Sequence, residues 1–181
     1  MKKIMMTLFI FAPFFTAIAK PLNVVKKDND VRSIYTIEKM IKIIQPSLKK
    51  SSVCRIAKYL SKISKNYKVD PKLMIAIIDT ESNFINSKVS ITGDISLAQI
   101  NTKVWDVEFN RLGLHKLNSK LLVKDENYAL EEMAIILTII KNRHAKTDQV
   151  WFARYHSHNK KFKDIYSLKI KKRMKMLAYV D

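Results

Sequence analysis

The stretch YKVDPKLMIAIIDTESNF, residues 67–84, decides the fold of this chain. It contains Asp70-Pro71, an N-cap residue followed by proline at the first helical position, where the fixed φ of proline suits the start of a helix. The apolar residues that follow continue the helical pattern to about Glu81. The stretch therefore predicts a core helix over about residues 70–81.

Working outward from that helix, the remaining apolar residues also recur at helical spacing, and the chain has only two glycines and four prolines. These features predict an all-α fold in a single domain. The expected helices cover about 30–44, 51–67, 99–110 and 127–143, followed by an aromatic-rich and then a Lys/Arg-dense helix within 149–180. Residues 83–101 should form a long loop, and a loop of that length is usually functional.

The N-terminus predicts export. Lys2 and Lys3 precede an apolar run that ends in the small-residue pattern Ala17-Ile18-Ala19, which is typical of a secretory signal peptide cleaved after Ala19. An uncleaved membrane anchor is the alternative, although the run contains Pro13 and is shorter than the roughly 20 residues a spanning helix needs. We therefore expect a signal peptide over 1–19, a polar leader and first helix over 20–50, and a catalytic domain over 51–181. The location should be periplasmic or extracellular.

The chain is strongly basic, with 34 Lys and Arg against 16 Asp and Glu, a formal charge of +18. Its partner should be anionic: nucleic acid, a membrane face or the bacterial cell wall. Export argues against nucleic acid. The basic C-terminal segment, 160–175, either attaches the protein to an anionic wall or membrane or packs its apolar side on the domain. A monomer is expected.

Glu81 is the residue whose position indicates chemistry. It follows Leu73 and Ile77 by eight and four residues, so its carboxyl lies on the apolar face of the core helix, and it falls in the last turn. Burial and the negative end of the helix dipole both raise the pKa of a carboxyl group. A carboxylic acid that is still protonated near neutral pH can act as a general acid. The alternative is an ordinary solvated glutamate at a helix end.

Three motifs in the same order resemble the soluble lytic transglycosylase (SLT) domain, which is related to goose-type lysozyme. Asp70-Pro71-Lys72-Leu73 leading to Glu81-Ser82-Asn83-Phe84 resembles the opening motif, and 93–100 (GDISLAQI) lies where the family has a glycine-rich loop ending Gly-Leu-Met-Gln-Ile. Arg154-Tyr155-His156-Ser157 resembles the Ala-Tyr-Asn-x-Gly segment. The resemblance covers about residues 51–155 and implies a lysozyme-like helical fold.

The resemblance also implies an activity. In this family one glutamate, here Glu81, protonates the oxygen that links N-acetylmuramic acid to N-acetylglucosamine in peptidoglycan. The resulting carboxylate then takes a proton from the muramic C6 hydroxyl, which closes on C1 and leaves a 1,6-anhydro end. Because that attack is intramolecular, a second carboxylate holding water is not needed. If water attacks instead, the protein is a lysozyme-type hydrolase.

Supporting site residues follow from matching positions. The resemblance implies that the Tyr155 hydroxyl contacts the catalytic acid, and that Ser82 and Gln99 bind sugar or orient Glu81. We expect the same kind of role for four more residues in these segments: Asp94, Ser96, Asn101 and His156. We expect no metal and no cofactor.

The chain departs from the family pattern around the sugar cleft. Only Gly93 remains of the loop glycines, so a loop that carries Asp94 and Ser96 must take another path or tolerate strain. His156 stands where asparagine is usual. One interpretation is a cleft adapted to N-deacetylated peptidoglycan, whose glucosamine ammonium can pair with Asp94, and the other is neutral drift.

Two other classes of function remain open. The altered loop is compatible with an inactive wall-binding module or a secretion-apparatus accessory. The basic C-terminal segment alone would suit a cationic membrane-active protein, whose activity would survive the loss of Glu81.

Overall fold

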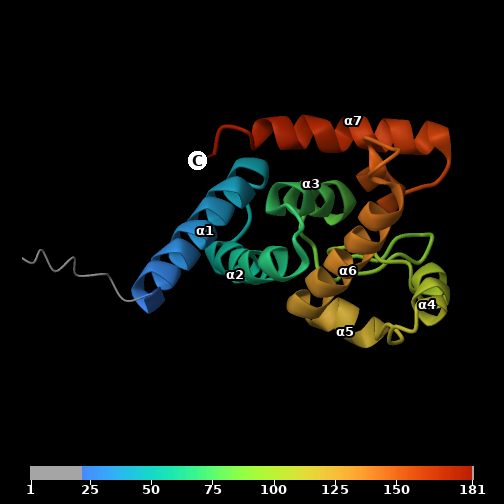
Figure 1. Ribbon diagram of the computed structural model, residues 1–181, viewed down its shortest axis with the longest axis horizontal. Coiled ribbons are helices and arrows are strands. Elements are labelled where there is room, and N and C mark those ends of the chain that lie inside the picture. The colour runs from blue at the N-terminus through green and yellow to red at the C-terminus, as the bar shows by residue number, and fades with distance from the viewer. Residues whose placement is uncertain (1–21, 181) are drawn as a thin grey trace, which may run out of the picture.

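The central element of the fold is α3, Pro71–Ser82, which other helices enclose (Figure 1). The computed structural model describes residues 22–180. Asp70 caps the helix as predicted, because its side chain accepts a hydrogen bond from the Lys72 backbone N–H at 2.8 Å. Asn83 ends it in the left-handed conformation, with φ of 52°. All side chains from residue 73 to 79 are buried, so α3 forms the middle of the core.

Three helices pack directly on α3: α1 (Leu22–Ile44), α2 (Lys50–Tyr67) and α7 (Lys160–Met176). A second group completes the domain, in which α6 (Glu126–His144) packs against α2, α5 (Ser119–Lys124) and the 3₁₀ helix η1 (Trp151–Tyr155). Figure 1 shows α7 lying along one edge of the molecule above α3, with α6 crossing nearby. One continuous apolar core runs through both groups.

The long segment between α3 and α4 (Thr102–Arg111) is the loop that the sequence predicts. Two isolated bridges, Val89 with Ile95 and Ile95 with Ile100, fold residues 83–101 back on themselves. Residues 22–180 contain no longer β-structure, and the all-α prediction is confirmed.

Two predictions about the helices need correction, and one helix was missed. Helix α1 begins at Leu22, so the expected polar leader is helical from that residue onward. The fourth helix begins at Thr102 rather than near Gln99, because Gln99 has a φ of 49° and Asn101 caps the helix through its side chain. The short α5 was not predicted at all. The expected signal peptide over 1–19 lies outside the described residues, and no helix within 22–180 is long and apolar enough to cross a membrane.

A buried ion pair fixes α7 to α3. Asp79 is only 6% exposed, and its carboxylate accepts from the Arg173 guanidinium at 2.6 Å and from the Gln45 amide at 2.8 Å. On the same helix Tyr166 and Ile170 are buried against the domain. The basic C-terminal segment therefore does pack one side on the domain, while several lysines point outward.

Candidate active site

Glu81 lies in the last turn of α3, where the buried helix meets a pocket. One carboxylate oxygen, Oε1, accepts a hydrogen bond of 2.6 Å from the hydroxyl of Tyr166 on α7. Tyr166 is itself only 4% exposed. Its burial raises the pKa of the hydroxyl well above the usual value, so at neutral pH the group is protonated and donates.

The environment of Glu81 raises the pKa of its carboxyl group to about 7. Burial is the main cause, and the negative charge of Asp94 adds to it. The hydrogen bond from Tyr166 and the positive charges of Lys88 and Lys169 act in the opposite direction. Near neutral pH the group is therefore present in both forms, which suits a residue that must first donate a proton and then accept one.

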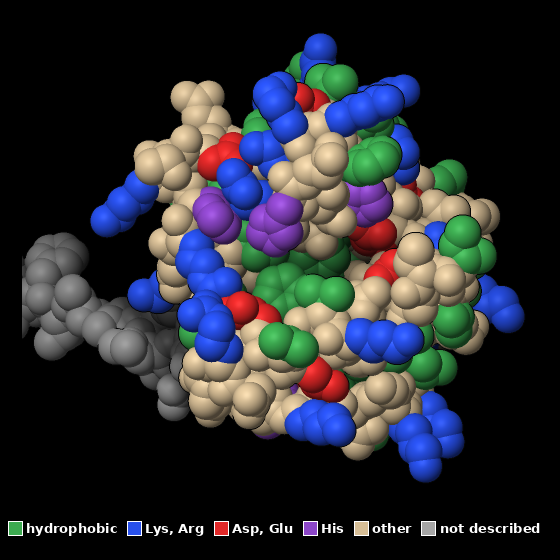
Figure 2. Space-filling model, turned by 90° about the vertical axis from the view of Figure 1, so that its right-hand side faces the viewer, with side chains coloured by type: hydrophobic (Ala, Val, Ile, Leu, Met, Phe, Trp, Pro, Cys, Tyr) green, Lys and Arg blue, Asp and Glu red, His purple; other side chains and the backbone are tan. Residues whose placement is uncertain are grey.

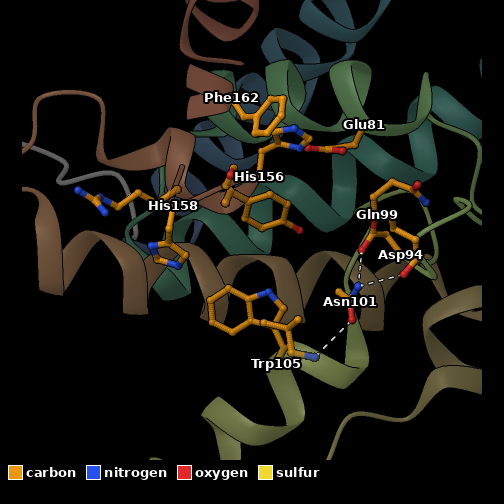
Figure 3. Close-up of a pocket in the computed structure, with 13 residues that line it drawn as sticks. Glu81, Asp94, Gln99, Asn101, Trp105, His156, His158 and Phe162 are labelled. Carbon is orange, nitrogen blue, oxygen red and sulfur yellow. Dashed lines mark hydrogen bonds between the residues drawn. The ribbon is translucent and has the colours of Figure 1, made fainter. Parts of the chain in front are cut away.

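The pocket beside Glu81 has a volume of about 440 Å³ (Figure 3). Of the predicted site residues it brings together six on its lining: Glu81, Asp94, Gln99, Asn101, Tyr155 and His156. The face of the molecule seen in Figure 2 is hollowed at its centre, with histidines along one rim and carboxylates at the side. Trp105 and Phe162 add aromatic surface to the lining, and a pocket that combines aromatic surface with a few polar groups is typical of a binding site for a small ligand.

Asp94 is held as a charged group on the loop side of the pocket. Its Oδ2 accepts from the hydroxyls of Ser90 (2.9 Å) and Thr92 (2.6 Å), and its Oδ1 accepts from the Asn101 amide at 2.8 Å. Burial alone would raise the pKa of Asp94, but these three hydrogen bonds outweigh it and the pKa is lowered. The pocket thus contains one carboxyl group that is half protonated near neutral pH and one that is ionised.

Ser82 and Ser96 do not reach the pocket, because both side chains are fully buried. The Ser82 hydroxyl lies 2.7 Å from the Leu97 carbonyl oxygen and 3.0 Å from that of Ile78, so it joins the end of α3 to the loop. The Ser96 oxygen accepts from the Ala98 backbone N–H at 3.2 Å. Both residues support the loop, and neither lines the pocket.

Two further predicted residues, Gln99 and Asn101, also form hydrogen bonds within the loop. The Gln99 amide donates to the carbonyl oxygens of Lys88 (3.1 Å) and Ser96 (2.8 Å). Asn101 accepts from the Val104 N–H as the N-cap of α4 while it donates to Asp94. The strain expected in a loop with few glycines is present, since Ser96 has a φ of 76° and Gln99 of 49°.

The expectation that Tyr155 contacts Glu81 through its hydroxyl needs correction. In η1, Tyr155 faces the loop, and its hydroxyl donates to the Ala98 carbonyl oxygen at 2.7 Å. The hydroxyl bound to Glu81 belongs to Tyr166, because α7 rather than η1 packs on α3. Tyr155 remains on the pocket lining, where it joins the loop to η1.

His156 packs against Tyr166. Its ring stacks flat on that of Tyr166, with centroids 4.7 Å apart and planes 9° from parallel. Burial lowers its pKa, and Lys169 lowers it further while Asp94 opposes both. The imidazole is therefore neutral at pH 7, and it covers the face of the tyrosine that holds Glu81.

Sequence reasoning missed two residues at Glu81. Tyr166 lies within the basic C-terminal segment, and nothing local in the sequence reveals a contact across 85 positions. Lys88, whose ammonium donates to the Glu81 carbonyl oxygen, was also missed, although its place in a predicted functional loop was a usable signal.

The family model described as "Transglycosylase SLT domain" matches residues 58–153, which is more than half of the chain and includes Glu81. The chain belongs to this family. Its members are peptidoglycan lytic transglycosylases, so peptidoglycan is the substrate class at the level of the family. No curated protein and no solved structure matched the chain. Within residues 22–180, no cluster of three metal-binding side chains is present.

Proposed function

We propose that this protein is a lytic transglycosylase that cuts the bond between N-acetylmuramic acid and N-acetylglucosamine, with Glu81 as its single acid and base. The observation that carries the proposal is the pKa of Glu81, raised to about 7 in a pocket that belongs to an SLT domain. A protonated Glu81 donates to the glycosidic oxygen while positive charge develops on the muramic ring. The Tyr166 hydroxyl, 2.6 Å from Oε1, holds the carboxyl in position and stabilises the carboxylate that forms.

The second half of the reaction uses the same carboxylate. It takes the proton from the muramic C6 hydroxyl, whose oxygen bonds to C1 and gives the 1,6-anhydro end. Glu81 is then protonated again and ready for the next bond. The apolar surroundings that raise its pKa favour both transfers, because the neutral and charged forms are close in free energy.

Asp94 supports a second candidate function, hydrolysis of strands with N-deacetylated glucosamine. Its ionised carboxylate lines the same pocket as Glu81. It can pair with a glucosamine ammonium, and it can also accept a hydrogen bond from a water molecule. In the first case the preferred substrate changes, and in the second the product becomes a reducing end.

The deciding experiment is mass spectrometry of the products released from purified peptidoglycan, native and N-deacetylated, by the wild-type protein and by Glu81→Gln. Anhydro ends that disappear in the variant support a transglycosylase, and reducing ends support a lysozyme. Removal of a general acid should lower the rate about 10²- to 10⁴-fold. Asp94→Asn serves as the matched comparison: it should reduce a preference for deacetylated strands if Asp94 pairs with the glucosamine ammonium, and it should lower the share of reducing ends if Asp94 holds the attacking water. No release from either substrate would favour a wall-binding module.

We also propose that the chain acts outside the cytoplasm after cleavage near Ala19, and that its positive charge holds it to anionic wall polymer as a monomer. The full chain has a charge of +18, and loss of Lys2 and Lys3 leaves +16 (18 − 2) on the mature protein. This charge and the lysines on the outer side of α7 support the contact. The mass of the mature protein recovered from the producing cell tests the cleavage. Binding to isolated walls should weaken as salt rises, because screening shortens the reach of surface charges.

A further inference from the structure

A second hollow adjoins Glu81, on the side of His156 away from Asp94. It has a volume of about 200 Å³, and Glu81, His156 and Phe162 line both it and the larger pocket. Its other lining residues are Thr80, Ile165, Tyr166 and Lys169. Figure 3 shows His156 beside Glu81 with Phe162 next to it, so these side chains form the partition between the two spaces. A substrate bound across Glu81 therefore has room for a branch on this side.

The two hollows differ in their charged groups. The larger pocket contains the ionised Asp94 and the guanidinium of Arg154, which is paired with Asp148, whereas the second hollow contains the exposed Lys169. No described carboxylate forms an ion pair with Lys169, yet its charge acts on Glu81 and on His156. Phe162 and Ile165 add apolar surface that is half exposed. This combination suits a short apolar group that ends in a carboxylate.

The proposed substrate carries such a group next to the bond that is cut. Muramic acid differs from glucosamine by a lactyl ether on C3, which bears a methyl group and a carboxyl group. In stem-free strands the lactyl carboxylate is free, and in stem-bearing strands a peptide with its own carboxylates is attached there. N-acetylglucosamine has only a hydroxyl at this position. The C3 substituent is thus the chemical feature that distinguishes one sugar of the strand from the other.

We infer that the hollow lined by Lys169, Phe162 and Ile165 binds the carboxylate-bearing C3 substituent of the muramic acid whose bond Glu81 cleaves. The inference rests on the proposed function and adds to it a residue that determines which sugar of the strand lies at Glu81. Because the strand alternates two sugars, a cation on one side of Glu81 ensures that muramic acid, and not glucosamine, presents its C1 to the acid. Lys169 is a specificity-determining residue in this arrangement.

The test is calorimetric titration of the Glu81→Gln protein, which leaves the sugars uncut, with three tetrasaccharides. These are a stem-bearing fragment of peptidoglycan, a stem-free fragment with lactyl carboxylates, and chitotetraose, which has no C3 substituent. We expect the Kd for chitotetraose to be about tenfold higher than the Kd for at least one of the anionic fragments. The fragment that binds more tightly identifies whether the lactyl or a peptide carboxylate is the ligand.

Variants of α7, made in the Glu81→Gln protein, separate the effect of the Lys169 charge from an effect on the structure of the helix. Lys169→Ala should remove most of the difference between chitotetraose and the preferred fragment, and Lys169→Arg should retain it. Lys171→Ala is the matched control, because Lys171 is exposed on the same helix but lines neither hollow, and it should keep the full difference.

Equal affinity for all three sugars, or an equal loss for all three in Lys169→Ala, would overturn the inference and leave the proposed function standing. Binding of none of the three would overturn the proposed function and the inference together.

Discussion

The two walls of the Glu81 pocket are built in different ways. The loop wall, residues 83–101, consists of turns and isolated bridges, and four of its non-glycine residues have positive φ: Asn83, Phe84, Ser96 and Gln99. The opposite wall is formed by residues 154–158 and by α7, a regular helix that contributes Phe162 to the lining and whose Tyr166 and Ile170 are buried in the core. Polar groups of the loop are fixed mainly by other groups of the same loop, whereas those of α7 are fixed by the packing of the whole domain.

This difference indicates how each wall should respond to substitution. A change in the loop should alter the local electrostatics or strain of the site and leave the rest of the fold intact. A change at an anchor of α7 should affect stability and catalysis together, because the helix that supplies Tyr166 is also part of the core. The four predictions below test this contrast in order of expected effect.

The largest effect is expected at the anchor of α7. Arg173→Met leaves the buried Asp79 carboxylate with only the Gln45 amide, and breaking a buried ion pair in this way costs about 3 kcal/mol of unfolding free energy. Urea denaturation followed by circular dichroism measures the loss. Adding Asp79→Asn should restore part of it, since a neutral amide needs no countercharge. A loss below about 1 kcal/mol would show that α7 is held by other contacts.

A smaller effect, about tenfold in kcat, is expected for Tyr166→Phe, which removes a hydrogen bond to a charged group. That bond lowers the pKa of Glu81, so its loss lets the pKa rise above about 7. Because the reaction needs protonated Glu81, the pH at which activity declines should move upward. Tyr155→Phe is the control, since its hydroxyl binds Ala98 and not Glu81. A shift of the pH profile in both variants, or in neither, would contradict the assignment.

On the loop wall, Ser96→Gly should raise the unfolding free energy by about 1 kcal/mol. Ser96 has a φ of 76°, where a side chain is strained and glycine is not, and the bond from Ala98 that is lost is long at 3.2 Å. Thermal unfolding measures the change. Ser87→Gly, at an exposed position without positive φ, should instead destabilise slightly. If Ser96→Gly destabilises as well, the hydroxyl matters more than the strain.

The smallest effect is a shift of a few tenths of a pH unit for Asp94→Asn, the size expected of a partly solvated charge. The negative charge of Asp94 raises the pKa of Glu81, so its removal lowers that pKa below about 7. The pH at which activity declines should therefore move downward, opposite to the shift for Tyr166→Phe. The profile of kcat against pH measures it, and an upward shift would exclude the assigned coupling.

Local patterns explain which parts of the structure could be predicted. The Asp70-Pro71 start and the apolar run that follows place α3 and Glu81 correctly, because N-caps and helical periodicity depend on neighbouring residues. The loop and its shortage of glycine also follow from the sequence, and the strain appears at Ser96. The short α5 was not predicted, because six residues are too few to show a helical periodicity.

The missed features share a different cause. The ion pair between Asp79 and Arg173 joins positions 94 residues apart, and the bond from Tyr166 to Glu81 spans 85. Which hydroxyl meets the acid depends on whether η1 or α7 packs on α3, and no periodicity within either segment decides that. The resemblance placed Tyr155 in the pocket region but could not supply the partner of its hydroxyl.

The position of Tyr166 has a consequence for how the proposed site is assembled. The match to the family ends at residue 153, yet the hydroxyl that holds Glu81 arrives with α7. A chain is synthesised from its N-terminus, so Glu81 precedes its partner by 85 residues. The contact that holds the proposed catalytic acid therefore forms only when α7 docks on α3. A chain that lacks α7 does not acquire this contact.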